Sequence, residues 1–228
     1  YGTELKTNNT KLAKMNLAIH GIEGKIIEDN SFYSDPHKLI GKCDFIMANP
    51  PFNVNKIDKK KDYIINDPRL PFGLPNSDNG NYMWIQYFHS YLNDKGRAGF
   101  VMASSATDAG GSEKLIRQKL IETGDVEAIV SISNNFFYTR SLPCHVWFLN
   151  KKKKDKDSIL MIDARNTFRK VNNTINDFSP DQLQGLTTII KSYRGESVDF
   201  TANEWLTKTF ESGSYEDIEG LCKVTNMN

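Results

Sequence analysis

Cysteine and histidine are scarce in this sequence. Among its 228 residues there are three cysteines, Cys43, Cys144 and Cys222, and four histidines. The cysteines lie far apart, in an odd number and without a C-x-x-C spacing, so neither a disulfide framework nor a zinc site is indicated. The histidines are scattered without the spacing of metal ligands, and we expect no metal site. Reduced thiols are typical of a reducing compartment.

An excess of charge and a long apolar run are also lacking. The net charge is only +1, from 29 Lys plus Arg against 28 Asp plus Glu. This balance excludes a polybasic binder, so any affinity for nucleic acid has to come from local clusters or from another subunit. No apolar run approaches the roughly 18 residues of a membrane span, and no charged-then-apolar leader opens the chain. We therefore expect a cytoplasmic protein without a membrane partner.

The chain does contain abundant core-forming material, with 13 Phe, 9 Tyr and 3 Trp. At this length such a composition can bury a sizeable core. Helix-like and strand-like stretches alternate: helices are expected over 8–20, 82–92 and 113–122, and strands over 25–28, 43–48, 98–103 and 126–132. This alternation predicts an α/β fold with a mostly parallel sheet.

The rhythm changes after residue 142. Two β-rich runs, 145–149 and 159–162, flank the lysine-rich stretch 151–157, which predicts an antiparallel pair at a sheet edge. Beyond residue 163 the chain is polar, with one helix expected over 180–193. We therefore divide the chain into a core, 1–163, and a C-terminal appendage, 164–228.

The motif Asn49-Pro50-Pro51-Phe52 follows the buried strand 43–48 directly. Open α/β sheets place their ligands at this carboxyl end of a strand. Successive prolines stiffen the turn and leave its carbonyls free to accept hydrogen bonds. Asn49 and the Pro50 carbonyl are thus suited to hold both hydrogens of an exocyclic amino group, which turns the nitrogen lone pair outward for attack on a sulfonium methyl. Phe52 would stack on a base that has left the duplex.

A plainer interpretation of the motif is a rigid Pro-Pro turn in which Asn49 makes only a local hydrogen bond. The position after a buried strand favours the chemical interpretation. Residues 53–80 are too long for an ordinary connection and predict a functional or mobile loop. Its cations are candidate phosphate contacts, although interspersed aspartates favour a solvated loop; they are Lys56, Lys59, Lys60, Lys61 and Arg69.

The motif resembles the catalytic motif of adenine-N6 DNA methyltransferases that use S-adenosyl-L-methionine. Further stretches are similar to the modification subunit of type I restriction-modification systems, and the likeness covers most of residues 1–225. These stretches are 13–21, Asp67-Pro68-Arg69, 81–86, Gly96-Arg97-Ala98 and 135–143. The resemblance implies a Rossmann-like methyltransferase sheet, with residues 1–163 as part of the catalytic core.

Carried onto this sequence, the resemblance assigns two acids to the cofactor. Glu4 matches the residue that ends the second strand and accepts from the cofactor ribose hydroxyls, as a carboxylate suits a diol. Asp29, with Asn30 after it, matches the residue that receives the adenine amino group, and Asn49 borders the cofactor as well. Solvated acids at strand ends remain the alternative, and Glu23 and Glu28 compete for the same roles.

Phe136 and Phe137 follow the strand 126–132 as an adjacent aromatic pair. Because two adjacent side chains cannot both face one core, one of them is a candidate stacking partner for the flipped base, as the resemblance also implies. Ordinary packing is the alternative for both. The sequence does not distinguish which of the two would stack.

One departure from the family pattern concerns the beginning of the chain. The family carries a glycine-rich cofactor loop after the first strand of its sheet, and neither precedes Tyr1. Gly110-Gly111 stands too late to replace that loop. We therefore expect an N-terminally truncated chain whose cofactor site is incomplete.

These observations favour an adenine-N6 DNA methyltransferase subunit of a type I restriction-modification system, using S-adenosyl-L-methionine. Double-stranded DNA and a separate specificity subunit are the expected partners, since no segment of this chain is typical of a base-reading helix. A restriction (nuclease) subunit is a further candidate partner. The alternatives are a related methyltransferase acting on a protein glutamine amide or an RNA base, and a non-catalytic assembly module.

Overall fold

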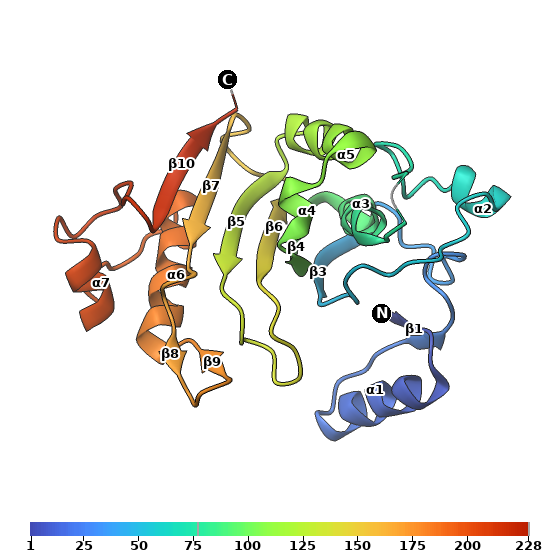
Figure 1. Ribbon diagram of the computed structural model, residues 1–228, viewed down its shortest axis with the longest axis horizontal. Helices are drawn as coiled ribbons and strands as arrows, with labels where there is room; N and C mark the ends of the chain where they lie inside the picture. The colour runs from blue at the N-terminus through green and yellow to red at the C-terminus, as the bar shows by residue number, and fades with distance from the viewer. Residues whose placement is uncertain (77, 228) are drawn as a thin grey trace.

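A mixed sheet forms the centre of the computed structural model, which describes residues 1–76 and 78–227. In this part of the chain six strands are hydrogen-bonded in the order β10-β7-β5-β6-β4-β3 (Figure 1). Their bounds are β3 Cys43–Ala48, β4 Leu92–Ala103, β5 Val126–Ile132, β6 Cys144–Asn150, β7 Ser158–Asp163 and β10 Cys222–Asn226. The predicted α/β class with a mostly parallel sheet is confirmed, because β3, β4, β5 and β7 run in one direction.

The predicted pairing of runs 145–149 and 159–162 is wrong. Strand β6 is antiparallel to both β4 and β5 and lies between them. Strand β7 is parallel to β5 on the other side. The lysine-rich stretch 151–157 therefore crosses β5 to reach β7, and the antiparallel edge is made instead by β10 against β7. Both runs are strands, but their neighbours depended on this crossover.

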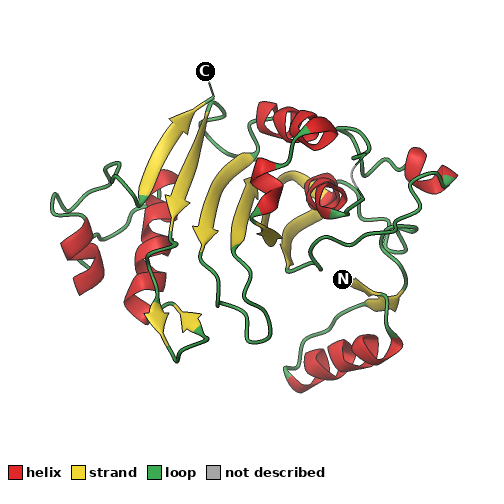
Figure 2. Ribbon diagram, viewed as in Figure 1, coloured by secondary structure: helices red, strands yellow, loops and turns green. Residues whose placement is uncertain are grey.

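Helices cover the two faces of the sheet over different strands (Figures 1 and 2). On one face α3 (Asn81–Tyr91) and α5 (Gly111–Glu122) pack on β4, β5 and β6 around Phe100 and Trp147. On the other face α6 (Pro180–Tyr193) packs on β5 and β7. Because β5 is covered on both faces, nearly all its residues are buried, which explains its continuous apolar run.

A second, small element precedes the main sheet. Strands β1 (Gly2–Glu4) and β2 (Ile26–Glu28) are parallel, are joined by α1 (Thr7–Ile19), and form a two-stranded sheet in which, within the described residues, neither pairs with a further strand. The helix predicted over 8–20 is confirmed. Its apolar residues Leu12, Met15 and Ile19 are nevertheless exposed, so the apolar stripe of the sequence has no covering partner in this structure.

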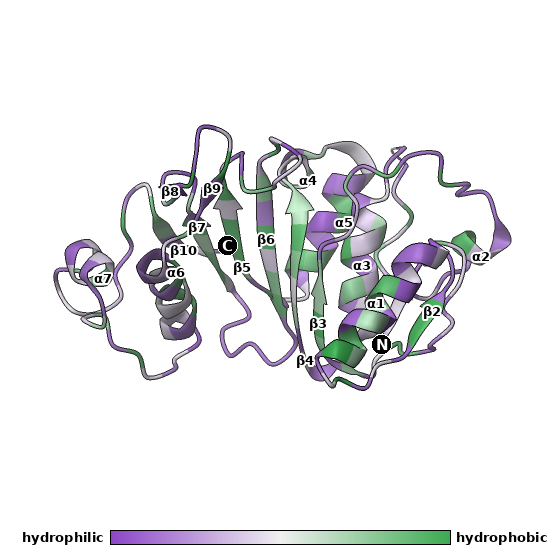
Figure 3. Ribbon diagram, turned by 90° about the horizontal axis from the view of Figure 1, so that it is seen from below, coloured by the Kyte–Doolittle hydropathy of each residue, from purple (hydrophilic) through white to green (hydrophobic). Residues whose placement is uncertain are grey.

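The prediction that the strand 43–48 is buried is wrong, because β3 is the edge strand of the main sheet and presents apolar side chains to solvent. Phe45 is 78% exposed and Met47 is 95% exposed, while the alternating Ile46 and Ala48 pack against the core on the opposite face. Hydropathy colouring shows apolar stretches on both α1 and β3 (Figure 3).

Residues 164–227 add several elements to the structure. The helix predicted over 180–193 is confirmed as α6, and Ser179 caps it in a capping box with Gln182. The hairpin β8 (Arg169–Lys170) with β9 (Asn176–Asp177) precedes it, and α7 (Glu204–Thr209) and β10 follow. The division into a core, 1–163, and an appendage, 164–228, stays a prediction, although β10 extends the main sheet.

The remaining short helices are α2 (Asp62–Ile65) and α4 (Ser105–Asp108). Over residues 1–76 and 78–227, no helix has the length and apolar content that crossing a membrane requires.

Candidate active site

The motif Asn49-Pro50-Pro51-Phe52 leaves the sheet at the carboxyl end of β3. Ala48, the last residue of that strand, is in register with Phe100 of β4. Pro50 is buried and Asn49 is exposed. The turn is thus anchored at the proline while its asparagine side chain stays accessible, which is the arrangement that the two prolines predict.

The motif lines one side of a cavity of about 460 Å³. The opposite side comes from the loop that joins β5 to β6, and it contributes Phe137, Thr139, Arg140 and Leu142. The volume lies within the range of small-molecule and cofactor pockets. Asn49 therefore borders a cavity whose lining includes two aromatic rings, those of Phe52 and Phe137.

The two adjacent phenylalanines have separate roles in packing. The Phe137 ring lies 6.0 Å from the Phe52 ring, with an angle of 80° between their planes. The Phe136 ring instead packs on Phe178, at 4.7 Å and 45°. Of the pair, Phe137 lines the cavity beside Asn49 and Phe136 anchors the loop to the segment before α6. This distinction depends on a residue far along the chain.

The residue after the motif is held by a side chain that sequence reasoning missed. Asn53 has a φ of 53°, in the left-handed region. Asn81, the first residue of α3, makes hydrogen bonds to its backbone and side chain. An asparagine at a helix start is ordinarily interpreted as a cap, so the sequence carried no signal for this contact.

The two candidate cofactor acids lie at the ends of neighbouring strands. Glu4 ends β1, and its carbonyl accepts a hydrogen bond from the Asp29 backbone N at 3.0 Å. The Asp29 carboxylate accepts from Ser34 Oγ at 2.6 Å and from Asn30 N at 2.7 Å. These bonds, that from Ser34 above all, lower the pKa of Asp29. The donors leave lone pairs free on both oxygens, so the charged carboxylate is suited to an amino or hydroxyl donor.

Glu28, which competes for the same role, and Glu4 have different hydrogen-bond partners. Glu28 accepts a hydrogen bond from Thr7 Oγ1 at 2.6 Å. Glu4 accepts from Lys6 N at 2.9 Å and from Asn9 Nδ2 at 3.3 Å. Neither Glu4 nor Asp29 lines the cavity beside Asn49. The structure therefore brings the two acids together, and it brings the motif together with Phe137, as two separate groups.

In the long segment 53–80, the described residues near Asp67 and Arg69 fold around a buried ion pair. Arg69 is 1% exposed and pairs with Asp67 at 2.7 Å. Its Nη1 donates to the Ser34 carbonyl and to Tyr91 Oη, each at 3.0 Å. Burial alone would lower the pKa of the guanidinium, but the bonds to Asp67 and Tyr91 raise it. Arg69 is therefore not a phosphate contact, and its part of the segment is a folded unit instead of a solvated loop.

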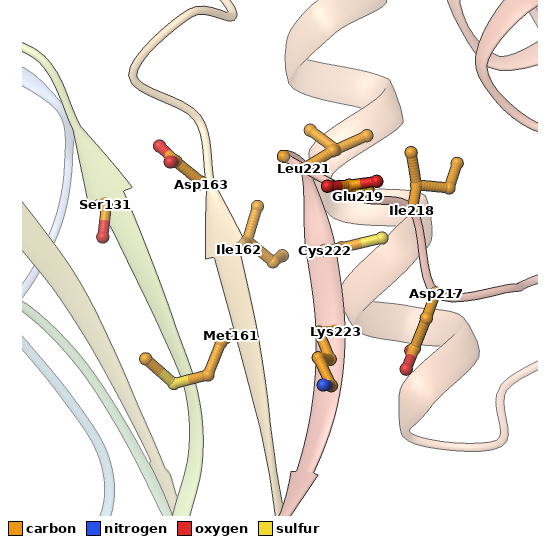
Figure 4. A pocket seen from close by; sticks show the side chains of 11 residues that line it. Ser131, Met161, Ile162, Asp163, Asp217, Ile218, Glu219, Leu221, Cys222 and Lys223 are labelled. Atoms are coloured by element: carbon orange, nitrogen blue, oxygen red, sulfur yellow. The ribbon is translucent and has the colours of Figure 1, made fainter.

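A larger cavity, of about 590 Å³, lies between β5, β7 and the segment before β10 (Figure 4). Its lining contains Asp163, Asp217 and Glu219. Asp163 is paired with Arg165, and Asp217 accepts hydrogen bonds from Tyr215 Oη and Val224 N. Carboxylates in this lining disfavour a phosphate-bearing ligand.

Comparison with known proteins identifies the protein family of this chain. The model of the family described as N-6 DNA methylase matches residues 1–226. The chain belongs to this family. The family predicted from the motif and its neighbouring stretches is therefore confirmed.

Individual relatives agree with the family. The chain is 35% identical, over 207 residues, to the type I restriction enzyme MjaIX methylase subunit of Methanocaldococcus jannaschii, covering 87% of this chain and 37% of that protein. It is 32% identical, over 233 residues, to the HindI methylase subunit of Haemophilus influenzae, covering 100% of this chain and 48% of that protein. The chain thus spans less than half the length of these relatives.

A solved structure supports the fold. The type I restriction-modification system methyltransferase subunit from Streptococcus thermophilus superposes with a TM-score of 0.82 at 22% identity, covering 99% of this chain and 44% of that one. The predicted Rossmann-like methyltransferase fold class is confirmed by this likeness.

Proposed function

We propose that this chain is part of the modification subunit of a type I restriction-modification system and methylates adenine N6 in DNA. One observation carries the proposal: Asn49 and Pro50 border a cavity with Phe52 and Phe137 on its sides, in a chain of the N-6 DNA methylase family. Amide and carbonyl acceptors beside aromatic faces match a planar base with an exocyclic amino group.

In the proposed reaction the target adenine leaves the duplex and enters this cavity, an extrusion that costs a few kcal/mol. Phe52 stacks on the base and Phe137, which packs edge to face on Phe52, contacts it from the other wall of the cavity, and these contacts offset part of that cost. Asn49 Oδ1 and the Pro50 carbonyl each accept one hydrogen of the amino group. Held in this way, the nitrogen cannot delocalise its lone pair fully into the ring, and the lone pair is available for attack.

S-adenosyl-L-methionine, when bound, supplies a methyl group on a positively charged sulfur. The adenine N6 lone pair forms the new N–C bond while the S–C bond breaks and its electrons return to sulfur. The proton that N6 loses would pass to solvent water. The residues of this chain therefore act by orientation, desolvation and hydrogen bonding, and the mechanism includes no covalent enzyme intermediate.

The cofactor contacts are proposed for the pair of acids on β1 and β2. Glu4 accepts hydrogen bonds from the ribose hydroxyls. Asp29 accepts a hydrogen bond from the adenine amino group of the cofactor, and Asn30 contacts the same ring. The lowered pKa of Asp29 supports this role, because an ionised carboxylate is the better acceptor. Asn49 borders the cofactor where it meets the base.

The proposed partners follow from the relatives, which are named as methylase subunits of type I restriction enzymes. A specificity subunit would select the DNA sequence, and a nuclease subunit would join the restricting form. Double-stranded DNA is the substrate both with and without the nuclease subunit.

The test is transfer of radiolabelled methyl from S-adenosyl-L-methionine by the complete subunit with its specificity partner, with label in DNA, RNA and protein counted separately. Wild type is compared with Asn49→Ala and with Asn55→Ala, an exposed asparagine of the following segment. We expect labelled N6-methyladenine in DNA, lost with Asn49→Ala and kept with Asn55→Ala. Label in protein or RNA would favour another amino substrate, and no label would favour an assembly module.

A further inference from the structure

The loop between β5 and β6 projects beyond the cavity as well as lining it. Tyr138 is 88% exposed, directly after the cavity residue Phe137. Arg140, which lines the cavity, is exposed too. An aromatic side chain at such exposure buries little apolar area in the folded chain, so its ring face is available to a binding partner.

Hydrogen bonds at its base and to the hairpin β8–β9 hold the loop in place. Asn135 adopts a φ of 67°, and its Oδ1 accepts a hydrogen bond from Ser141 Oγ at 2.6 Å, which closes the base of the loop. The Asn135 carbonyl accepts from Asn176 N of β9 at 2.8 Å. The hairpin β8–β9 therefore lies against the loop, as Figure 1 also shows.

This contact brings a second cation to the loop. Lys170 of β8 is in register with Asn176, the residue that bonds to Asn135. Lys170 is exposed. Its neighbour Arg169 is engaged in an ion pair with Asp177 at 2.6 Å, which joins the two strands of the hairpin.

Arg140 and Lys170 differ from the nearby arginines in having no internal partner. Arg165 and Arg169 are each paired with an aspartate at 2.6 Å. For the side chains of Arg140 and Lys170, no hydrogen bond or ion pair exists with any residue in 1–76 or 78–227. A cation of this kind can bind a phosphate without first breaking an internal bond, so its charge is available at little cost.

We infer that Tyr138, Arg140 and Lys170 form a DNA-gripping tip, in which the two cations bind backbone phosphates next to the extruded adenosine and Tyr138 stacks on a neighbouring base. The inference rests on the proposed function. An extruded nucleotide stays linked to the strand through a phosphate on each side, so Arg140 in the cavity lining and Lys170 beside the same loop are placed to meet those charges. The aromatic face adds sequence-independent stacking.

The tip is tested with the complete subunit and its specificity partner, using unmodified phage DNA and labelled S-adenosyl-L-methionine across a range of salt concentrations. Arg140→Gln and Lys170→Gln are each expected to raise the KM for DNA and to reduce the salt slope of kcat/KM by about 1. Tyr138→Ala is expected to raise the KM for DNA about tenfold. The KM for S-adenosyl-L-methionine stays unchanged in all three.

The control is Lys191→Gln, an exposed lysine in the last turn of α6. That end of α6 lies near the start of β5, since Arg194 pairs with Glu127 there, at the opposite end of the strand from the loop. Arg140→Gln and Lys170→Gln behaving like Lys191→Gln, with an active wild type, would overturn the tip. A wild type that transfers no methyl to DNA would instead remove the proposed function, and the tip with it.

Discussion

The side chain of Asn81 holds Asn53 by two hydrogen bonds. Asn81 Oδ1 accepts from the Asn53 backbone N at 2.9 Å, and Asn81 Nδ2 donates to Asn53 Oδ1 at 2.8 Å. Asn81 is 3% exposed. Asn53 follows Phe52 with a left-handed φ, a conformation that costs free energy in a residue other than glycine. The paired amides offset that cost and fix the exit of the motif.

Replacement of Asn81 is therefore expected to act on the orientation of the motif. Asn81→Ala should lower kcat for methyl transfer about tenfold, with little change in the KM for S-adenosyl-L-methionine, because the motif loses its fixed exit. Steady-state kinetics measure both constants. Adding Asn53→Gly should restore part of the rate, since glycine adopts a positive φ without strain. No rescue together with a lowered melting temperature would mean that Asn81 serves only stability.

Phe136 and Phe137 are expected to differ in their effect on methyl transfer. Phe137→Ala should lower kcat/KM for DNA about tenfold by removing a contact with the base, in addition to the loss of stability that its packing on Phe52 implies. Phe136→Ala should lower stability, since its ring packs on Phe178. Urea unfolding and methyl-transfer kinetics on both variants check this. The reverse pattern would assign the base contact to Phe136.

Arg69 is expected to matter for stability and not for DNA affinity. Arg69→Gln leaves Asp67 buried without its partner, which should cost about 3 to 5 kcal/mol in the free energy of unfolding. Lys60→Gln, an exposed lysine of the same segment, is the matched control. Denaturant unfolding gives the free energies. A stable Arg69→Gln protein with a reduced salt slope of DNA binding would instead make Arg69 a phosphate contact.

Asp125 carries a pH-dependent part of the stability. It pairs with His89 of α3 at 2.8 Å, with Lys151 at 3.0 Å and with Lys156 at 2.7 Å. Burial alone would raise the pKa of Asp125, but the hydrogen bonds from these three residues outweigh it and hold the pKa far below the ordinary value. The network joins α3 to the start of β5 and to the crossover after β6.

Asp125→Asn should therefore cost about 3 kcal/mol at neutral pH. A carboxyl group whose pKa is lower in the folded state than in the unfolded state stabilises the folded protein at pH values above its unfolded pKa. This contribution is lost as the pH falls towards the folded pKa. The difference in the free energy of unfolding between wild type and Asp125→Asn should stay constant above about pH 5. It should become smaller below about pH 4. Urea unfolding at several pH values measures it. A difference independent of pH down to 3 would attribute the cost to packing.

The parts of the fold that the sequence predicted are those with strong local patterns. The strand 126–132 and the helix 180–193 have the predicted bounds, because one is a continuous apolar run and the other carries a capping box. Strand β10 was missed, since Cys222–Asn226 is short and mostly polar, and its pairing with β7 is what makes it a strand. Neighbours in a sheet are set by crossovers, which local patterns do not encode.

The candidate site shows the same limit. The motif at the end of β3 was located from Asn49-Pro50-Pro51-Phe52 alone, because two prolines after an apolar run are a local signal. The contacts that hold the motif and its neighbouring loop in place were not predicted. The contacts of Phe136 with Phe178 and of Asn53 with Asn81 join residues 42 and 28 positions apart, so they arise only in the folded chain.

The exposed apolar edge of β3 has a practical consequence for work with these 228 residues. Phe45 and Met47 stand on a strand whose outer backbone groups have no strand neighbour among the described residues. Such an edge is a template for intermolecular β-pairing. Preparations of this polypeptide alone are therefore expected to aggregate as their concentration rises, and Met47→Lys is expected to reduce that aggregation.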